Sequence, residues 1–309
     1  MSLYSAYGLT IKSDFLLPEL LPGVGIINLH VQKDKIQVPA LEETSIKRQG
    51  VSAYFGGNDQ TAYLHWPEVA SFFAQDGKYL TVQPAKDELD SSYLNLYLLS
   101  EALGMILYQQ GYILLHGSAV KVKGKAVIFA GAPGAGKSTM AAAFSRLGYP
   151  ILGDDMVAMK LTPQGQVIVY PGFPQIKIWS PTVQGLKLQS ETLSPLFSGS
   201  HKKLLRPQKF RPEPIPLAAC FMLSRGEKLE LNSLEGQKAL MSLFRFFSCP
   251  GQMLVGESLD NYRQQCLALT KIIPILELKR PDNFSVLRKF VNWVIKSSKT
   301  EHLAVNVNN

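Results

Sequence analysis

The chain has 309 residues, of which 46% are hydrophobic and 18% are charged, and this balance excludes an intrinsically disordered protein. No apolar stretch reaches the roughly 20 residues that cross a bilayer, because Asn95, Ser100 and Glu101 interrupt the richest one. The N-terminus lacks the basic and apolar regions of a signal peptide, so we expect a cytoplasmic protein without a membrane partner.

The net charge of +8 suits a protein that handles polyphosphates or an acidic partner. The basic residues are spread along the chain, and no nucleic-acid-binding signature occurs, so no nucleic acid partner is expected. Cys220, Cys249 and Cys266 are far apart and lack the CxxC spacing of a metal or redox site. They are expected to be reduced core thiols.

Residues 1–88 contain short segments of alternating polarity separated by Pro, Gly, Asn and Asp. Such a pattern predicts a small β-rich N-terminal domain. His30 and His65 lie inside strand-like segments without a second ligand at metal spacing. Both are therefore expected to be packed or surface imidazoles.

Residues 90–111 open with an Asp-Ser-Ser cluster, close at Gly111 and carry apolar residues on nearly every face, which predicts a mostly buried helix. Two strands are expected next, over 113–122 and 125–130, joined by a tight turn at Lys123 and Gly124.

These elements begin a larger C-terminal domain over residues 89–298, which we expect to have an α/β fold. Residues 299–309 are expected to be a frayed tail.

The string GAPGAGKST fills the pattern G-x-x-x-x-G-K-[ST] and predicts a phosphate-binding loop. Its glycines let successive backbone N–H groups turn toward phosphate oxygens at the positive end of the next helix. The lysine of this pattern contacts the β- and γ-phosphates, and its serine hydroxyl is a ligand of Mg²⁺. The predicted nucleotide-binding residues are Gly131, Ala132, Pro133, Gly134, Ala135, Gly136, Lys137, Ser138 and Thr139.

The flanks of the motif have the required pattern, with an apolar strand over 126–130 and a helix over 139–147 that stops at Gly148. The alternative interpretation is a Gly-rich turn that fits the motif by chance.

Later segments complete the domain. Residues 157–172 predict a β-hairpin, 217–226 a strand, and 259–273 and 284–298 two helices. Residues 181–216 are rich in Ser, Pro and basic residues with little periodicity, so we expect a mobile lid or substrate loop; a merely flexible connection is the alternative.

A phosphoryl-transfer site also needs carboxylates and further cations. Asp154 and Asp155 follow a short apolar strand, where ligands bind in open α/β sheets, although an exposed turn is the alternative. His116 ends an apolar strand, where a core histidine is the alternative. The basic run over 201–211 contacts phosphate in one interpretation and is a solvated face in the other.

Together, LLHGSAVKVKGKAVIFAGAPGAGKST and the following LGDD resemble the catalytic core of the HPr serine kinase/phosphorylase family. The resemblance covers about forty residues, and its spacings are 137 − 116 = 21 and 155 − 137 = 18 positions. It implies ATP-dependent transfer to a serine hydroxyl by a P-loop catalytic domain related to PEP carboxykinases, with the small β-rich domain preceding it.

The resemblance also implies roles for individual residues. Lys137 would contact the terminal phosphates of ATP, Ser138 and Asp154 would hold Mg²⁺, and His116 would lie at the transferring phosphate. Asp155 would be the base for the serine hydroxyl. The resemblance also implies a further basic residue later in the sequence, and Lys203 and Arg206 are the candidates for it.

Two departures separate the chain from the enzymes that modify the phosphocarrier HPr: Thr139 replaces a glutamate, and IVYPGFPQIKIW lacks the acidic metal ligand of their signature. With its opening YSAYGLTIKSDFLLPEL, the chain is more similar to the homologues associated with peptide natural products, such as lasso-peptide precursor kinases. The family includes hexamers, so a homo-oligomer is left open.

The leading hypothesis is therefore an ATP- and Mg²⁺-dependent serine kinase that acts on a peptide or small protein. The first alternative is a kinase of the same fold for an amino acid or metabolite hydroxyl. The second is a non-enzymatic, nucleotide-gated peptide-binding protein.

Overall fold

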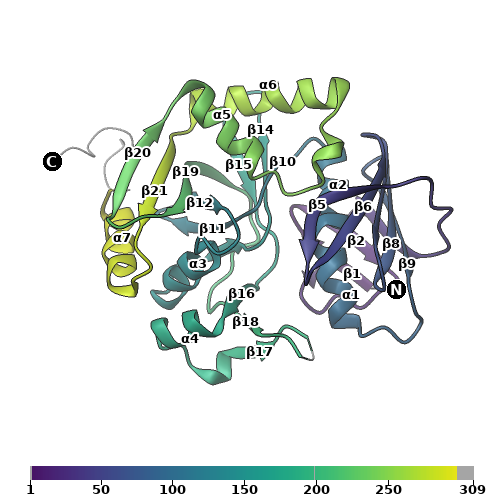
Figure 1. Ribbon diagram of the computed structural model, residues 1–309, viewed down its shortest axis with the longest axis horizontal. Coiled ribbons are helices and arrows are strands. Elements are labelled where there is room, and N and C mark those ends of the chain that lie inside the picture. The colour runs from purple at the N-terminus through teal and green to yellow at the C-terminus, as the bar shows by residue number, and fades with distance from the viewer. Residues whose placement is uncertain (1, 198, 298–309) are drawn as a thin grey trace. The chain divides into compact units, whose positions relative to one another are not determined.

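The computed structural model describes residues 2–197 and 199–297, and in it the chain folds into two compact units (Figure 1). The first unit contains the residues up to Leu114 together with Phe247–Gln264. The second contains Leu115–Phe246 together with the chain from Gln265 onward. The predicted tail over 299–309 lies outside the described residues.

The first unit is built on a nine-stranded sheet in the order β3-β1-β2-β4-β9-β8-β7-β6-β5. Side chains alternate along it as the sequence predicts: in β7, Ala62, Leu64 and Trp66 are buried. The strands are β1 (Ser2–Ala6), β2 (Leu9–Ser13), β3 (Leu21–Pro22), β4 (Leu29–Lys33), β5 (Glu42–Arg48), β6 (Val51–Gly57), β7 (Thr61–Trp66), β8 (Ala70–Gln75) and β9 (Tyr79–Pro84).

The helix expected over 90–111 is present as α1 (Ser91–Tyr97), a π-turn (Leu98–Ala102) and α2 (Leu103–Gln109). Asp90 caps it by accepting a hydrogen bond from the Ser92 N–H at 2.8 Å. The backbone is irregular at Ser100, whose hydroxyl donates to the Leu96 carbonyl at 2.7 Å.

This helix belongs to the first unit, so the division of the chain differs from the predicted boundary after residue 88. Helix α2 packs on β8 and β9, and the buried ion pair of Arg48 and Glu101, at 2.8 Å, joins the helix to β5. Tyr108 also contacts Phe247 at a centroid distance of 5.5 Å. Hydropathy along the chain cannot reveal such contacts between distant segments.

The second unit contains a mixed sheet in the order β14-β15-β19-β12-β11-β13, and β21 lies beside β19 with β20 at its edge. Strands β12, β19 and β21 are parallel, so their carboxyl ends lie at one edge of the sheet. The strands are β10 (Ile113–Leu115), which leads into the unit, β11 (Gly117–Val122), β12 (Lys125–Gly131), β13 (Ile151–Gly153), β14 (Val157–Leu161), β15 (Val167–Tyr170), β19 (Ile215–Arg225), β20 (Glu230–Leu234) and β21 (Ile275–Arg280).

Two helices cover one face of this sheet, α3 (Lys137–Arg146) and α7 (Phe284–Ser297). The core between them is aromatic: Phe129 stacks on Phe144 and on Phe221, at 5.6 and 5.7 Å between centroids, and Phe221 meets Phe290 edge-on at 5.4 Å. Burial of these rings fixes α3 against β12, which sets the direction of the loop between them. The other helices are α4 (Ser180–Leu186), α5 (Gly236–Arg245) and α6 (Gly256–Ile272).

Residues 181–216 contain more regular structure than their sequence predicts. Helix α4 is followed by a short 3₁₀ turn and by β17 and β18, which form a three-stranded sheet with β16, the strand before α4, in the order β16-β18-β17. These strands are β16 (Ile176–Trp179), β17 (Leu193–Pro195) and β18 (Lys202–Leu205). They are short, and Ile176, Ile178 and Leu205 pack into the main core, so tertiary packing stabilises them rather than local propensity.

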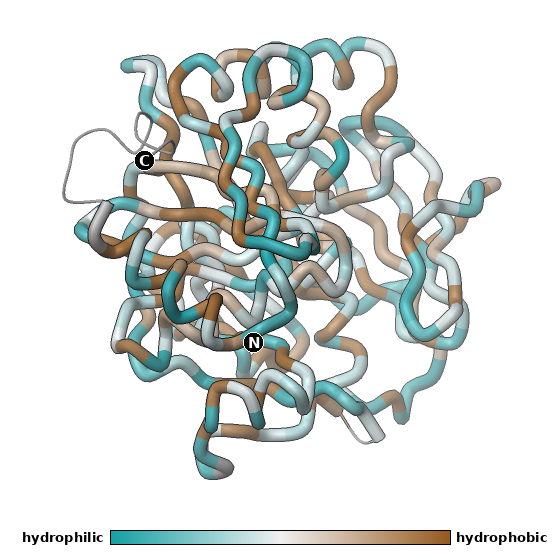
Figure 2. The backbone as a smooth tube through the Cα atoms, turned by 60° about the vertical axis from the view of Figure 1, so that its left-hand side comes forward, coloured by the Kyte–Doolittle hydropathy of each residue, from teal (hydrophilic) through white to brown (hydrophobic). Residues whose placement is uncertain are grey.

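Figure 2 shows apolar and polar residues interleaved along the chain. Within the described residues, no helix combines the length and apolar character required to cross a membrane. Cys220, Cys249 and Cys266 are buried free thiols, as predicted. His30 stacks on Tyr79 and His65 bonds to Ser71 at 2.9 Å, so both are packed imidazoles.

Candidate active site

The GAPGAGKST motif forms the connection between β12 and α3, with the strand before it and the helix after it that the sequence predicts. Gly134 and Gly136 have φ values of 81° and 98°, in the region that favours glycine. Gly136 directly precedes the first helical residue, so the first backbone N–H groups of α3 lie at the loop. This is the backbone geometry that binds anions at a helix N-terminus.

Lys137 is folded back over the loop. Its ammonium donates to the carbonyl oxygens of Gly131 at 2.8 Å and Ala132 at 3.1 Å, and only 7% of the residue is exposed. Burial lowers the pKa of Lys137, against the opposing attraction of Asp155 and Asp154. The ammonium is therefore held against the backbone of the loop.

Asp154 is the buried carboxylate of the acidic pair and follows β13 directly, at the predicted end of a strand. Its Oδ1 accepts from the hydroxyls of Ser118 at 2.5 Å and Ser138 at 2.9 Å, and its Oδ2 accepts from the Lys177 N–H at 2.8 Å. Burial raises the pKa of Asp154, and these hydrogen bonds oppose that shift. Asp154 thus joins the loop serine to β11 and β16.

Asp155 has a left-handed backbone with φ of 75°, and its carboxylate has other partners than that of Asp154. Its Oδ2 forms an ion pair with the Lys177 ammonium at 2.8 Å, and its Oδ1 lies 3.7 Å from His116 Nδ1. The side chain is 26% exposed. Of the two carboxylates, Asp155 is therefore the one that an external group can reach.

His116 occupies the break between β10 and β11, where its backbone N–H donates to the Phe246 carbonyl at 2.7 Å. Its Nδ1 lies 2.9 Å from the Asp155 carbonyl oxygen. Since a carbonyl oxygen only accepts, Nδ1 carries the proton, and Nε2 of the neutral ring is an acceptor. Burial lowers the pKa of His116, although the Asp155 charge opposes this, so the ring is neutral near pH 7.

Lys177 is a member of this cluster that the sequence analysis did not single out. It lies in β16 between the buried residues Ile176 and Ile178, so the pleat turns its side chain to the opposite face, toward Asp155. A lone lysine between two isoleucines after PGFPQ was the available signal, but its partner depends on tertiary contact.

The structure does not bring Lys203 or Arg206 to this cluster. In the β16–β18 register, Lys203 pairs with Ile178 and therefore lies on the opposite face from Lys177. Lys202 pairs with Trp179 on the Lys177 face, and its positive charge contributes to the lowered pKa of Lys137. Of the basic residues in 201–211, Lys202 is thus the one whose charge acts on Lys137 of the loop. Arg206 is exposed and lines a separate pocket.

Arg280, at the end of β21, packs against the phosphate loop at Ala135 and Gly136. It is 6% exposed, its Nη2 lies 3.4 Å from the Ala135 carbonyl, and a Cβ added to Gly136 would come within 2.0 Å of that nitrogen. Its Nε is buried without a hydrogen-bond partner among the described residues. The loop therefore lies against a buried guanidinium, which makes its environment more positive.

Thr139 bonds to Thr182 at 2.8 Å and so links α3 to α4. No group of three or more His, Cys, Asp or Glu side chains with metal-binding geometry occurs in the described part of the chain. The oxygen donors that the site offers a hard cation are Asp154 and Ser138, so such an ion would need further oxygens from a ligand or water.

Comparison with protein families and with curated proteins gives no match. Among solved structures, the chain is similar to the Hpr(Ser) kinase/phosphatase from Coxiella burnetii, with a TM-score of 0.32 and 13% sequence identity. The match covers 60% of this chain and 98% of that one. The similarity is distant, so the function is argued below from the contacts of the site.

Proposed function

We propose that the protein is an ATP- and Mg²⁺-dependent kinase that phosphorylates a serine hydroxyl of a peptide or small protein. The observation that carries the proposal is the position of Asp155. This partly exposed carboxylate lies beside His116 and Lys177, and the adjacent Asp154 bonds the serine of the phosphate loop.

The loop would bind the phosphates of ATP through the backbone N–H groups at the start of α3, and Lys137 would exchange its carbonyl partners for the terminal phosphates. The oxygens of Ser138 and Asp154 suit Mg²⁺, which prefers oxygen ligands. When bound, this ion supplies neutralisation of the charge on the phosphates.

In the transfer step, a bond forms between the acceptor serine oxygen and the γ-phosphorus, and the bond from that phosphorus to the oxygen of ADP breaks. The proton of the serine hydroxyl goes to the Asp155 carboxylate. A carboxylate paired with Lys177 is a weak base, and it suffices because proton transfer is late in a loose transition state.

His116 and Lys177 would position this base from two sides, since each contacts a different atom of Asp155. The neutral imidazole adds no positive charge there, and its Nε2 is an acceptor for a hydroxyl. The other cations, Lys137 and Lys202, act on the side of the phosphates. The proposal thus assigns proton removal to Asp155 and phosphate binding to Lys137 and Lys202.

The experiment is incubation of the purified protein with γ-labelled ATP and Mg²⁺, against serine-containing peptides, small proteins and free serine in separate reactions. The proposal predicts label in acid-stable phosphoserine of a peptide or protein. Label in free serine alone would support the small-molecule alternative. ATP binding without transfer to any acceptor, across a broad peptide library, would contradict the assignment as a kinase.

A further inference from the structure

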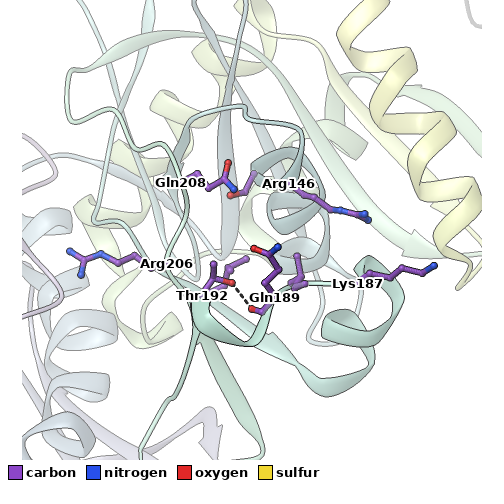
Figure 3. Close-up of a pocket in the computed structure, with 9 residues that line it drawn as sticks. Arg146, Lys187, Gln189, Thr192, Arg206 and Gln208 are labelled. Atoms are coloured by element: carbon purple, nitrogen blue, oxygen red, sulfur yellow. Dashed lines mark hydrogen bonds between the residues drawn. The ribbon is translucent and has the colours of Figure 1, made fainter.

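A pocket lies at the other end of α3 from the phosphate loop. Its volume is about 270 Å³, and Figure 3 shows the side chains around it. They come from the end of α3, the segment after α4 and the segment after β18, and they include Arg146, Lys187, Gln189, Thr192, Arg206 and Gln208.

Three basic side chains and no acidic side chain line this pocket. Arg146, Lys187 and Arg206 are exposed, no acidic residue lines the pocket, and no ion pair involves these three within residues 2–197 and 199–297. Glu191, the nearest acid in the sequence, is not among the lining residues. In Figure 3, Arg206 and Lys187 lie on opposite sides of the pocket, and their charged ends point away from it. Both side chains are exposed, so an anion at the rim of the pocket would gain a charge-assisted hydrogen bond from a cation that turns toward it.

The backbone at Lys187 has a conformation that favours glycine. Its φ is 49°, and the end of α4 is closed by hydrogen bonds from the Lys187 N–H to Gln184 at 3.1 Å and from the Leu188 N–H to Val183 at 3.0 Å. A lysine at this helix end is conformationally unfavourable relative to glycine, so a glycine at this position would keep the backbone conformation.

The pocket lies at a defined distance from the proposed phosphoryl-transfer site. From Lys137 to Arg146, nine steps along α3 span about 14 Å, at 1.5 Å per residue. From Lys202 to Arg206, four extended residues span about 13 Å. An extended peptide covers this distance with about four residues.

We infer that this pocket binds an acidic side chain of the peptide substrate, about four residues from the serine that is phosphorylated. The inference rests on the proposed function for its distance argument, and on the pocket itself for the acidic character of the ligand. It assigns to Arg206 and Lys187 a role in substrate recognition instead of a role at the transferring phosphate.

The test is binding of labelled peptides to the intact protein without ATP, by fluorescence anisotropy at low salt. The peptides Ser-Gly-Ala-Gly-Glu-Glu and Glu-Glu-Gly-Ala-Gly-Ser cover both chain directions, and the same sequences with Gln in place of Glu are the controls. One of the acidic peptides should bind at least about tenfold more tightly than its Gln counterpart, and salt should weaken this preference.

Two variants assign the preference to the pocket. Arg206→Gln should remove most of it, and so should Lys187→Gly, which suits the left-handed backbone and therefore should not destabilise the fold. Lys238→Gln, an exposed change in α5 outside the pocket, removes the same charge and should keep the preference. Equal binding of Glu and Gln peptides, or a preference unchanged in both pocket variants, would overturn the inference.

Phosphoryl transfer to the same peptides separates this inference from the proposed function. If acidic peptides bind through the pocket but receive no label, the kinase assignment fails and the pocket stands. If peptides are labelled at equal kcat/KM with Glu and with Gln, the kinase stands and the pocket assignment is wrong.

Discussion

The two ends of α3 differ in how their charged side chains are held. At its N-terminal end, Lys137, Asp154 and Lys177 are largely buried and bonded to neighbouring groups or to backbone carbonyls. At its C-terminal end, Arg146 and Arg206 extend into solvent around an open pocket.

We infer from this difference that the N-terminal end of α3 positions groups for catalysis, whereas the C-terminal end attracts an anion. Buried, bonded groups have their geometry fixed before a ligand arrives, which is the requirement for catalysis. Exposed cations attract an anion over a distance but lose side-chain entropy when they bind it. Substitutions at the first end should therefore change kcat, and those at the second should change KM. The helix dipole favours this arrangement, since its positive end faces the proposed phosphates and Arg146 lies at its negative end.

The largest change expected among the loop cations is in Lys137→Met. Loss of a preorganised cation at the transferring phosphate should lower kcat/KM by about 10²–10³-fold. It should also remove any preference for ATP over ADP, measured by titration calorimetry. Lys238→Met, an exposed lysine far from the loop in sequence, is the control. Unchanged affinities for both nucleotides would remove the terminal-phosphate role from Lys137.

Lys177→Met tests the residue that the sequence did not reveal. Asp155 would lose the ion pair at 2.8 Å, so kcat should fall about tenfold or more while ATP affinity is kept. Lys177→Arg keeps the charge and should restore part of the rate. Rapid-quench measurement of label transfer gives kcat directly, and a wild-type rate in the methionine variant would show that Asp155 needs no such support.

Gly136→Ala tests whether the loop depends on Arg280. The alanine would have φ of 98° and would displace the guanidinium, whereas Gly165→Ala has φ of 75° with open space around its Cβ. We expect a loss of about 1–2 kcal/mol of unfolding free energy at Gly165, and about 1–3 kcal/mol more at Gly136. Urea denaturation measures both.

Repeating Gly136→Ala in an Arg280→Ala protein separates the cost of the positive φ from the cost of displacing the guanidinium. In Arg280→Ala protein, Gly136→Ala should have an effect no larger than that of Gly165→Ala, because the steric conflict is gone. An undiminished extra loss in that background would mean that the guanidinium is not what the loop packs against.

The smallest effect is in the pH dependence of stability through His116. Burial lowers its pKa below the ordinary value of 6.5, so the unfolded chain binds the proton more readily in the window below 6.5. Stability should be complete above 6.5 and should decrease toward the lowered pKa, by at most about 1.4 kcal/mol per pH unit.

Denaturation of wild type and His116→Asn across this range isolates the contribution of the ring, since His65, whose pKa burial also lowers, is common to both. Parallel curves for the two proteins would show that His116 titrates as an exposed histidine does.

Local patterns predicted one part of the site. The glycines, Lys137 and Ser138 follow from a motif, and the end of β13 before Asp154 follows from a short apolar run, because strand, loop and helix lie close together in the sequence. The interruption between β10 and β11 at His116 was also predicted, because an apolar strand stops there in the sequence.

Tertiary register decided the rest. Whether Lys202 or Lys203 faces Lys177 depends on a shift of one residue in β18, which a basic run does not specify. Arg280 reaches the loop because β21 is parallel to β19 and β19 to β12, over separations of many residues. The sequence of α2 does not indicate that this helix packs on β8 and β9.

The most direct test of the central claim is single-turnover transfer from γ-labelled ATP to a serine peptide by wild type and Asp155→Asn. ATP affinity is measured on the same preparations, and Asp59→Asn, an exposed change in the first unit, serves as control. Asp155→Asn should bind ATP as wild type does and transfer at least about a hundredfold more slowly. Equal transfer rates would contradict the assignment of Asp155 as the base.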